Sequence, residues 1–175
     1  VPLARARLAH SPVRVVTVAN FPDGSDDIAR SARETAEALA AGADEVDVVA
    51  PIQAILEGDI GLVTELVHAC REKAPDATLK VILETGRLAE PAPIAAAARA
   101  AIMGGCDMLK TSTGKLAPGA TLEAAAILLA VIEEADGRVG IKFSGGIRTT
   151  QQAAQYLWLV DHFLGSGWTS PTTVR

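Results

Sequence analysis

The sequence predicts an α/β fold, a (β/α)8 or TIM barrel that is incomplete here, with about five β/α units present. Three observations support this prediction. Apolar, β-branched runs recur at intervals of roughly thirty residues, which is the length of one strand–helix unit. A loop with glycine or proline follows each run and leads into an alanine- and leucine-rich amphipathic stretch. Charged residues lie within three of the runs, near their carboxyl ends.

The individual elements follow from these periodicities. The expected strands are Val13–Phe21, Glu45–Pro51, Thr78–Gly86, Met108–Gly114 and Arg138–Gly146. Five helices are expected. The first is capped by Asp26 and ended by Gly42, the second is opened by Asp59, and the third covers about Pro93–Met103. The fourth is begun by Thr121, and the fifth is begun by Thr149 or Thr150 and has Ala153, Leu157 and Val160 inward. Residues Pro2–Ala9 look like the end of a further helix.

Alternating strands and helices imply a parallel sheet, which can be an open doubly wound sheet or a closed barrel. The polar residues favour the barrel. Asp47, Lys110 and Lys142 lie near strand ends, where they would face the mouth of a barrel but would be buried under helices in a doubly wound sheet. A complete barrel usually needs about 250 residues. We therefore expect residues 1–175 to be one partial barrel domain, an interior stretch of a longer barrel.

Composition excludes several classes of function. With 16 basic and 21 acidic residues, the net charge of −5 argues against general nucleic-acid binding. Cys70 and Cys106 form no CxxC motif, and His10, His68 and His162 have no metal-ligand spacing, so neither a disulfide framework nor a metal site is predicted. No apolar run reaches the roughly 18 residues of a membrane span, and no signal peptide is recognisable, so we expect a cytoplasmic protein.

The segment Met108–Lys115 carries the sharpest local signal. In a strand, Lys110 shares a face with Met108 and Ser112, while Leu109 and Thr111 pack under the helices. Lys110 then points into the barrel, where desolvation favours the neutral amine that attack on a carbonyl requires. The alternative is an ordinary exposed lysine at a strand end, and this segment alone does not decide between the two.

Two further residues strengthen the catalytic interpretation. Lys142 points inward by the same alternation, one strand over, where strands lie about 4.8 Å apart and two ammonium groups repel. Asp47 faces the interior too, so its carboxylate can hold one lysine charged and shuttle protons. Asp47 could instead be only a salt-bridge partner, the structural part expected of Asp44 and Glu45.

The loops after the last two strands predict a phosphate site. They are small and rich in hydrogen-bond donors, and glycine lets the backbone approach an anion closely. The candidate residues are Thr113, Gly114, Lys115, Gly145, Gly146 and Arg148. Arg148 could alternatively cap a helix or form a rim salt bridge. Glu84, at the end of the third strand, is expected to pair with an inward lysine or to act in catalysis.

Together these segments resemble the deoxyribose-phosphate aldolase family. The matching stretches are VTVANFPDG at 16–24, GADEVDVV at 42–49, LKVILETG at 79–86, LKTSTGK at 109–115 and GIKFSGGIRT from Gly140. Phe143 departs from the proline or small residue expected beside Lys142. The resemblance also implies that the first two strands of the family and its last strand lie outside these residues, so that this length of chain alone would be unstable or inactive.

The resemblance implies a lyase without metal or organic cofactor. Such an enzyme cleaves 2-deoxy-D-ribose 5-phosphate reversibly to D-glyceraldehyde 3-phosphate and acetaldehyde, a step of deoxyribonucleotide catabolism. It implies Lys110 as the Schiff-base lysine, Lys142 as its electrostatic partner and Asp47 in the proton relay, with the six loop residues above contacting substrate or phosphate. The implied partners are small sugar phosphates and aldehydes, with a homodimer or homotetramer possible. Two alternatives stay open: a class I barrel aldolase for another sugar phosphate, and a non-catalytic barrel that only binds a phosphorylated ligand.

Overall fold

The computed structural model describes residues 1–88 and 90–175 and contains a five-stranded parallel sheet. Its strands are β1 (Val16–Ala19), β2 (Glu45–Val49), β3 (Thr78–Ile82), β4 (Met108–Lys110) and β5 (Gly140–Lys142), and each pairs with the next in sequence. All five predicted strands are confirmed. They are shorter than the apolar runs, because the carboxyl end of each run leaves the hydrogen-bonded ladder and forms a loop.

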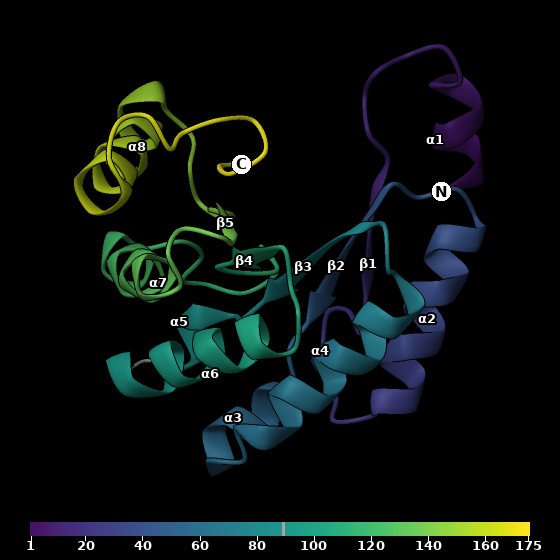
Figure 1. The fold of residues 1–175 in the computed structure, drawn as a ribbon, viewed down its shortest axis with the longest axis horizontal. Helices are drawn as coiled ribbons and strands as arrows, with labels where there is room; N and C mark the ends of the chain where they lie inside the picture. Colours follow the sequence, from purple (N-terminus) through teal and green to yellow (C-terminus); the bar gives the residue numbers. More distant parts are fainter. Residues whose placement is uncertain (89) are drawn as a thin grey trace.

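The long helices lie on one face of this sheet. The helices of the described residues are α1 (Pro2–Arg7), α2 (Ile28–Ala40), α3 (Ile52–Glu57), α4 (Gly61–Lys73), α5 (Thr85–Leu88), α6 (Pro91–Met103), α7 (Leu122–Glu134) and α8 (Thr150–Leu164). Helices α2, α4, α6, α7 and α8 pack against one another in that order and form an arc around the strands (Figure 1). A doubly wound sheet would carry helices on both faces. The arrangement is therefore part of a barrel wall, as predicted.

Side-chain caps begin α2, α7 and α8, whereas α4 begins at Gly61 after Ile60 and not at Asp59 as predicted. The side chain of Asp27, not Asp26, caps α2 by accepting a hydrogen bond from the backbone N of Arg30 at 2.8 Å. Thr121 caps α7 and Thr149 caps α8 as predicted, each accepting from the backbone N three residues later. None of the helices in the described residues is long and apolar enough to cross a membrane.

The core lies between the sheet and the helical arc. Alternate strand residues point outward and are fully buried under the helices: Val46, Val48, Leu79, Val81, Leu109 and Ile141. Helix α6 approaches α4 closely, because a Cβ atom on Gly104 would lie 2.7 Å from Cβ of Val67. Cys70 and Cys106 are buried, unbonded thiols in this layer. Burial of apolar area in this layer is the main stabilising contribution.

The inward face of α8 differs from the prediction. Val160 is fully buried, but Leu157 is 42% exposed and Tyr156 is buried in its place. Tyr156 packs on Phe143, with ring centroids 4.7 Å apart. The apolar stripe of α8 is thus one position away from the predicted one, because an aromatic residue next to a leucine makes the sequence pattern ambiguous.

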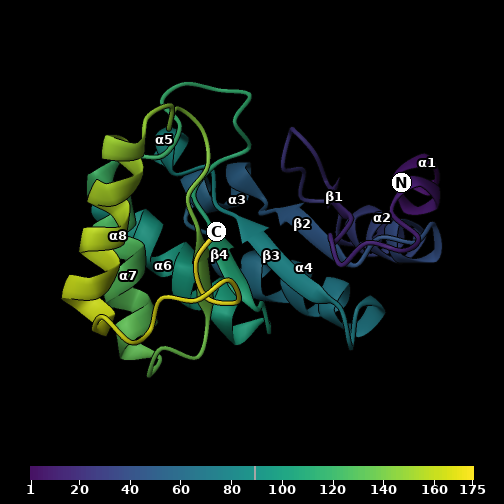
Figure 2. The same ribbon diagram turned by 90° about the horizontal axis from the view of Figure 1, so that it is seen from above.

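The last residues of the given sequence lie against β5. Val174 forms a parallel bridge with Ile141, and the backbone N of Phe143 donates to the carbonyl O of Arg175 at 2.9 Å. In Figure 2 this yellow segment lies over the sheet on the side away from the helices. These contacts form an isolated bridge and not a strand, so β5 is the last strand of the sheet in the described residues, as expected.

Candidate active site

Charged side chains from four neighbouring strands meet on the concave face of the sheet, which the helices leave uncovered. Asp47 on β2 is in register with Lys80 on β3, and Lys110 on β4 is in register with Lys142 on β5. Alternation along each strand turns all four side chains away from the helices. The predicted inward orientation of Asp47, Lys110 and Lys142 is confirmed.

Asp47 is the centre of this cluster. Its Oδ2 atom accepts hydrogen bonds from Nζ of Lys110 at 2.9 Å and from Nζ of Lys142 at 2.8 Å. Its Oδ1 atom accepts one from Nζ of Lys80 at 2.6 Å. Asp47 and Lys110 are 1% and 7% exposed, whereas the side chain of Lys142 keeps 24% of its surface accessible. The two predicted lysines thus share one oxygen of a single buried carboxylate.

A second layer of charge lies below Asp47 and was not predicted. Lys80 is fully buried, and its Nζ also contacts Oε2 of Glu45 at 2.7 Å. Glu45, itself fully buried, accepts from the guanidinium of Arg175 at 2.7 Å. The alternation rule applied to Thr78–Ile82 would have turned Lys80 inward, so a sequence signal existed for this residue. Glu45 keeps the structural role expected of it.

These contacts set the protonation of the site. Burial alone would raise the pKa of Asp47, but the positive charges of Lys110 and Lys80 and hydrogen bonds from Lys142 and Lys80 outweigh it and lower this pKa to about 2. Burial lowers the pKa of Lys110; Asp47 opposes the change, and the charges of Lys142 and Lys80 add to it. Asp47 is therefore an anion at neutral pH, and Lys110 loses its proton more readily than an exposed lysine.

The loops after β4 and β5 are joined at the mouth above these lysines. The hydroxyl of Thr111 donates to the carbonyl O of Ser144 at 3.2 Å, and the backbone N of Ser144 donates back to that hydroxyl at 3.0 Å. The backbone N of Ala120 lies 3.0 Å from the carbonyl O of both Ser144 and Gly145. The two predicted phosphate loops therefore form one connected rim.

Glu84 holds the first of these loops. Its Oε2 accepts from the backbone N of Thr113 at 3.2 Å and from the Thr113 hydroxyl, and the backbone N of Lys115 donates to that hydroxyl at 3.1 Å. The expected pairing of Glu84 with an inward lysine is wrong. The loop after β4 folds back over β3, and Thr113 of this loop forms the hydrogen bonds to the carboxylate of Glu84. Gly114, between the two, has φ +77°, which favours glycine.

The remaining predicted phosphate residues line the same rim. Gly145 and Gly146 have φ values of +91° and +87°, conformations that favour glycine. Lys115 and Arg148 are exposed, and the backbone N of Arg148 donates to Oε1 of Gln152 in the cap of α8. The rim thus offers two exposed cations and a glycine turn, although the positive residues do not contact one another.

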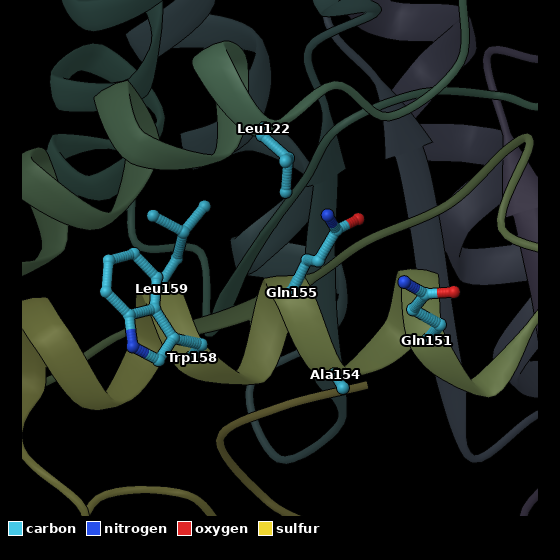
Figure 3. A pocket seen from close by; sticks show the side chains of 6 residues that line it. All are labelled: Leu122, Gln151, Ala154, Gln155, Trp158 and Leu159. Atoms are coloured by element: carbon cyan, nitrogen blue, oxygen red, sulfur yellow. The ribbon is translucent and has the colours of Figure 1, made fainter.

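A separate pocket lies on the outside of the molecule, between α8 and the start of α7. Figure 3 shows its lining, which is Leu122, Gln151, Ala154, Gln155, Trp158 and Leu159. It contains no acid, base or nucleophile that could act on a carbonyl. Within residues 1–88 and 90–175, no group of three or more His, Cys, Asp or Glu residues could hold a metal ion. The lysine cluster is therefore the candidate active site.

The cluster has the parts needed for amine chemistry on a carbonyl compound. A buried lysine with a lowered pKa can act as the nucleophile, and a carboxylate hydrogen-bonded to two ammonium groups can exchange protons with either. Lys142 is more accessible than Lys110 and Asp47 and lies on the side of the mouth, where the glycine rim can receive an anionic group. The cluster therefore combines an amine, a proton-exchanging carboxylate and a rim with hydrogen-bond donors.

Known proteins share the sequence and fold of this chain. Residues 1–157 match the model of the DeoC/LacD family aldolases. The aldolase QR15 is 33% identical, with a TM-score of 0.77 over 90% of this chain and 71% of QR15. A Coccidioides immitis protein assigned to the deoxyribose-phosphate aldolases is 32% identical, with a TM-score of 0.86 over 90% of this chain, which spans 62% of that protein. The tetrameric deoxyribose phosphate aldolase of Aeropyrum pernix is 26% identical, with a TM-score of 0.73 over 90% of this chain and 64% of its own. The chain belongs to the DeoC/LacD family of aldolases.

Proposed function

We propose that the complete protein cleaves 2-deoxy-D-ribose 5-phosphate reversibly to D-glyceraldehyde 3-phosphate and acetaldehyde, through a Schiff base on Lys110. The observation that carries this proposal is the shared carboxylate: Oδ2 of Asp47 contacts the Nζ atoms of Lys110 and Lys142 at 2.9 and 2.8 Å. Two lysine ammonium groups on one oxygen of a buried carboxylate have little structural use, because burying charge in a protein interior is costly.

In the proposed mechanism, the neutral amine of Lys110 attacks the C1 aldehyde of the open-chain sugar, and loss of water gives an iminium ion. Removal of the proton from the C3 hydroxyl then breaks the C2–C3 bond. Glyceraldehyde 3-phosphate leaves, and the two-carbon unit stays on Lys110 as an enamine. Protonation at C2 and hydrolysis release acetaldehyde and restore the amine. Asp47 and Lys142 exchange the protons, because both lie within hydrogen-bond distance of one another beside Lys110.

The glycine rim is proposed to bind the phosphate. The backbone N–H groups around Gly145 and Gly146 and the side chains of Lys115 and Arg148 lie on the loops at the carboxyl ends of β4 and β5. Phosphate sites of β/α barrels are often built from such late loops. A homodimer or homotetramer is also proposed, which sedimentation or light scattering of the complete protein would test.

The test is chemical trapping in the complete protein. Incubation with acetaldehyde and borohydride should add a two-carbon unit, which peptide mass spectrometry should locate on Lys110. Lys110→Ala should abolish both the adduct and turnover while the circular dichroism spectrum is retained. Lys73→Ala is the matched control, because Lys73 is an exposed lysine on α4 and its loss should change neither.

Two results would contradict the proposal. An adduct on another lysine, or none, would reject Lys110 as the nucleophile. Adduct formation without cleavage of deoxyribose phosphate would favour an aldolase for another sugar phosphate, and a panel of phosphorylated sugars would then identify the substrate.

A further inference from the structure

Lys80 occupies a position that the proposed mechanism does not use. It is fully buried at the centre of β3, in register with Asp47. Its Nζ lies 2.6 Å from Oδ1 of Asp47 and 2.7 Å from Oε2 of Glu45. Lys80 therefore occupies one oxygen of Asp47, and the other oxygen is left for the two lysines of the proposed mechanism.

The charges around Lys110 do not balance if every group is ionised. Asp47, Lys142 and Lys80 act directly on Lys110. Beyond Lys80 the cluster continues through Glu45 to Arg175, and Arg14 approaches Glu45 from before β1 at 3.6 Å. Two carboxylates thus meet four buried or half-buried cations, Lys110 included. Loss of one proton relieves this excess of positive charge.

The contacts indicate which amine gives up its proton. Lys80 has two carboxylate partners, whereas Lys110 shares a single oxygen of Asp47 with Lys142. An ammonium group that contacts two carboxylates is better stabilised than one that shares a single carboxylate oxygen with another ammonium group. Lys80 therefore has the stronger ionic contacts, and Lys110 is the amine whose pKa is lowered.

We propose that Lys80 is a positioning residue for the aldolase site, which orients the carboxylate of Asp47 and, as a fixed buried cation, keeps the amine of Lys110 unprotonated. This inference rests on the proposed function, since it assumes that Lys110 is the nucleophile. The direction of the Lys110 pKa agrees with it: burial is the largest cause of the lowering, and the charges of Lys142 and Lys80 both contribute. Glu45, which is itself paired with Arg175, contacts Lys80 on the side away from Asp47.

The experiment measures the pH dependence of Lys110 adduct formation with acetaldehyde and borohydride in the complete protein. Lys80→Met removes the cation and should move the midpoint of adduct formation upward by about 1 to 2 pH units, the size expected for a like charge at this separation. Lys80→Arg keeps the charge and should restore the midpoint of the parent protein. A purely structural lysine would change the amount of active protein but not the midpoint.

Glu45→Gln provides a second arm should Lys80→Met fail to fold. It removes a buried negative charge from the cluster and leaves Lys80 in place, so the excess of positive charge grows and the midpoint for Lys110 should move downward, opposite to Lys80→Met. Unchanged midpoints in these variants, with a normal adduct in the parent, would overturn the role of Lys80 alone. A parent protein without an adduct on Lys110 would instead overturn the proposed function, and this inference with it.

Discussion

Replacing Asp47 by asparagine removes the only carboxylate that contacts all three lysines, while the side chain keeps its size. The pKa of Asp47 is about 2, compared with its ordinary value of 3.8, and a difference of one pKa unit corresponds to about 1.4 kcal/mol. Ionised Asp47 therefore contributes roughly 2 kcal/mol to the free energy of unfolding at pH 7. Because the buried Lys80 and Lys110 and the half-buried Lys142 also lose this anionic contact, the total loss for Asp47→Asn should be about 2 to 5 kcal/mol.

The dependence on pH separates this effect from general disruption. The pKa of Asp47 is lower in the folded than in the unfolded protein, so its contribution is complete above about pH 4 and disappears as the pH falls through 2. The difference in unfolding free energy between the parent and Asp47→Asn, measured in urea, should shrink by roughly 1 kcal/mol from pH 7 to pH 3.

A matched control is Glu134→Gln, because Glu134 pairs with Arg99 on the exposed surface of α6 and α7. This substitution should change the unfolding free energy little at either pH. A difference between the parent and Asp47→Asn that is constant, or that grows toward pH 3, would refute the ion-pair account of Asp47.

Two further predictions concern the rim. Gly119→Ala would place a methyl group 2.5 Å from the carbonyl O of Gly145. It should therefore separate the two loops and lower the free energy of unfolding by about 1 to 3 kcal/mol. The control is Gly167→Ala, whose added methyl group would have no atom within 4 Å, so the urea midpoint should stay unchanged. Glu84→Gln should weaken the hold on the loop at Thr113 and raise KM for the sugar phosphate about tenfold, with kcat within about twofold. An effect on kcat alone would contradict a loop-holding role for Glu84.

Much of the fold was predictable because its signals are local. The alternation of strands and helices follows from apolar periodicity, and the one-sided helical layer follows from charged residues inside strands. The short helices α3 (Ile52–Glu57) and α5 (Thr85–Leu88) were not predicted, because each is too short to show a periodicity of its own. The choice between Asp26 and Asp27 as the cap of α2 also depends on packing rather than on residue type.

The site was predictable where alternation within one strand sufficed. The inward positions of Asp47, Lys110 and Lys142 follow from that rule. The role of Lys80 does not, because it depends on the register between β2 and β3, which aligns Lys80 with Asp47 and not with a neighbour one residue away. The pairing of Glu84 with Thr113 likewise depends on how a loop folds back, which single-strand patterns do not encode.

The ion pair between Arg175 and Glu45 has a consequence for folding kinetics. The two residues are 130 positions apart in sequence, yet their side chains meet at 2.7 Å inside the sheet. Local strand–helix units can form early, whereas this contact closes only after all five strands have assembled, and non-local contacts of this kind slow folding. Until then Glu45 contacts Lys80 but lacks Arg175, its second cationic partner. We therefore expect the charged interior to remain hydrated and to lose its water late, after the helical layer has packed.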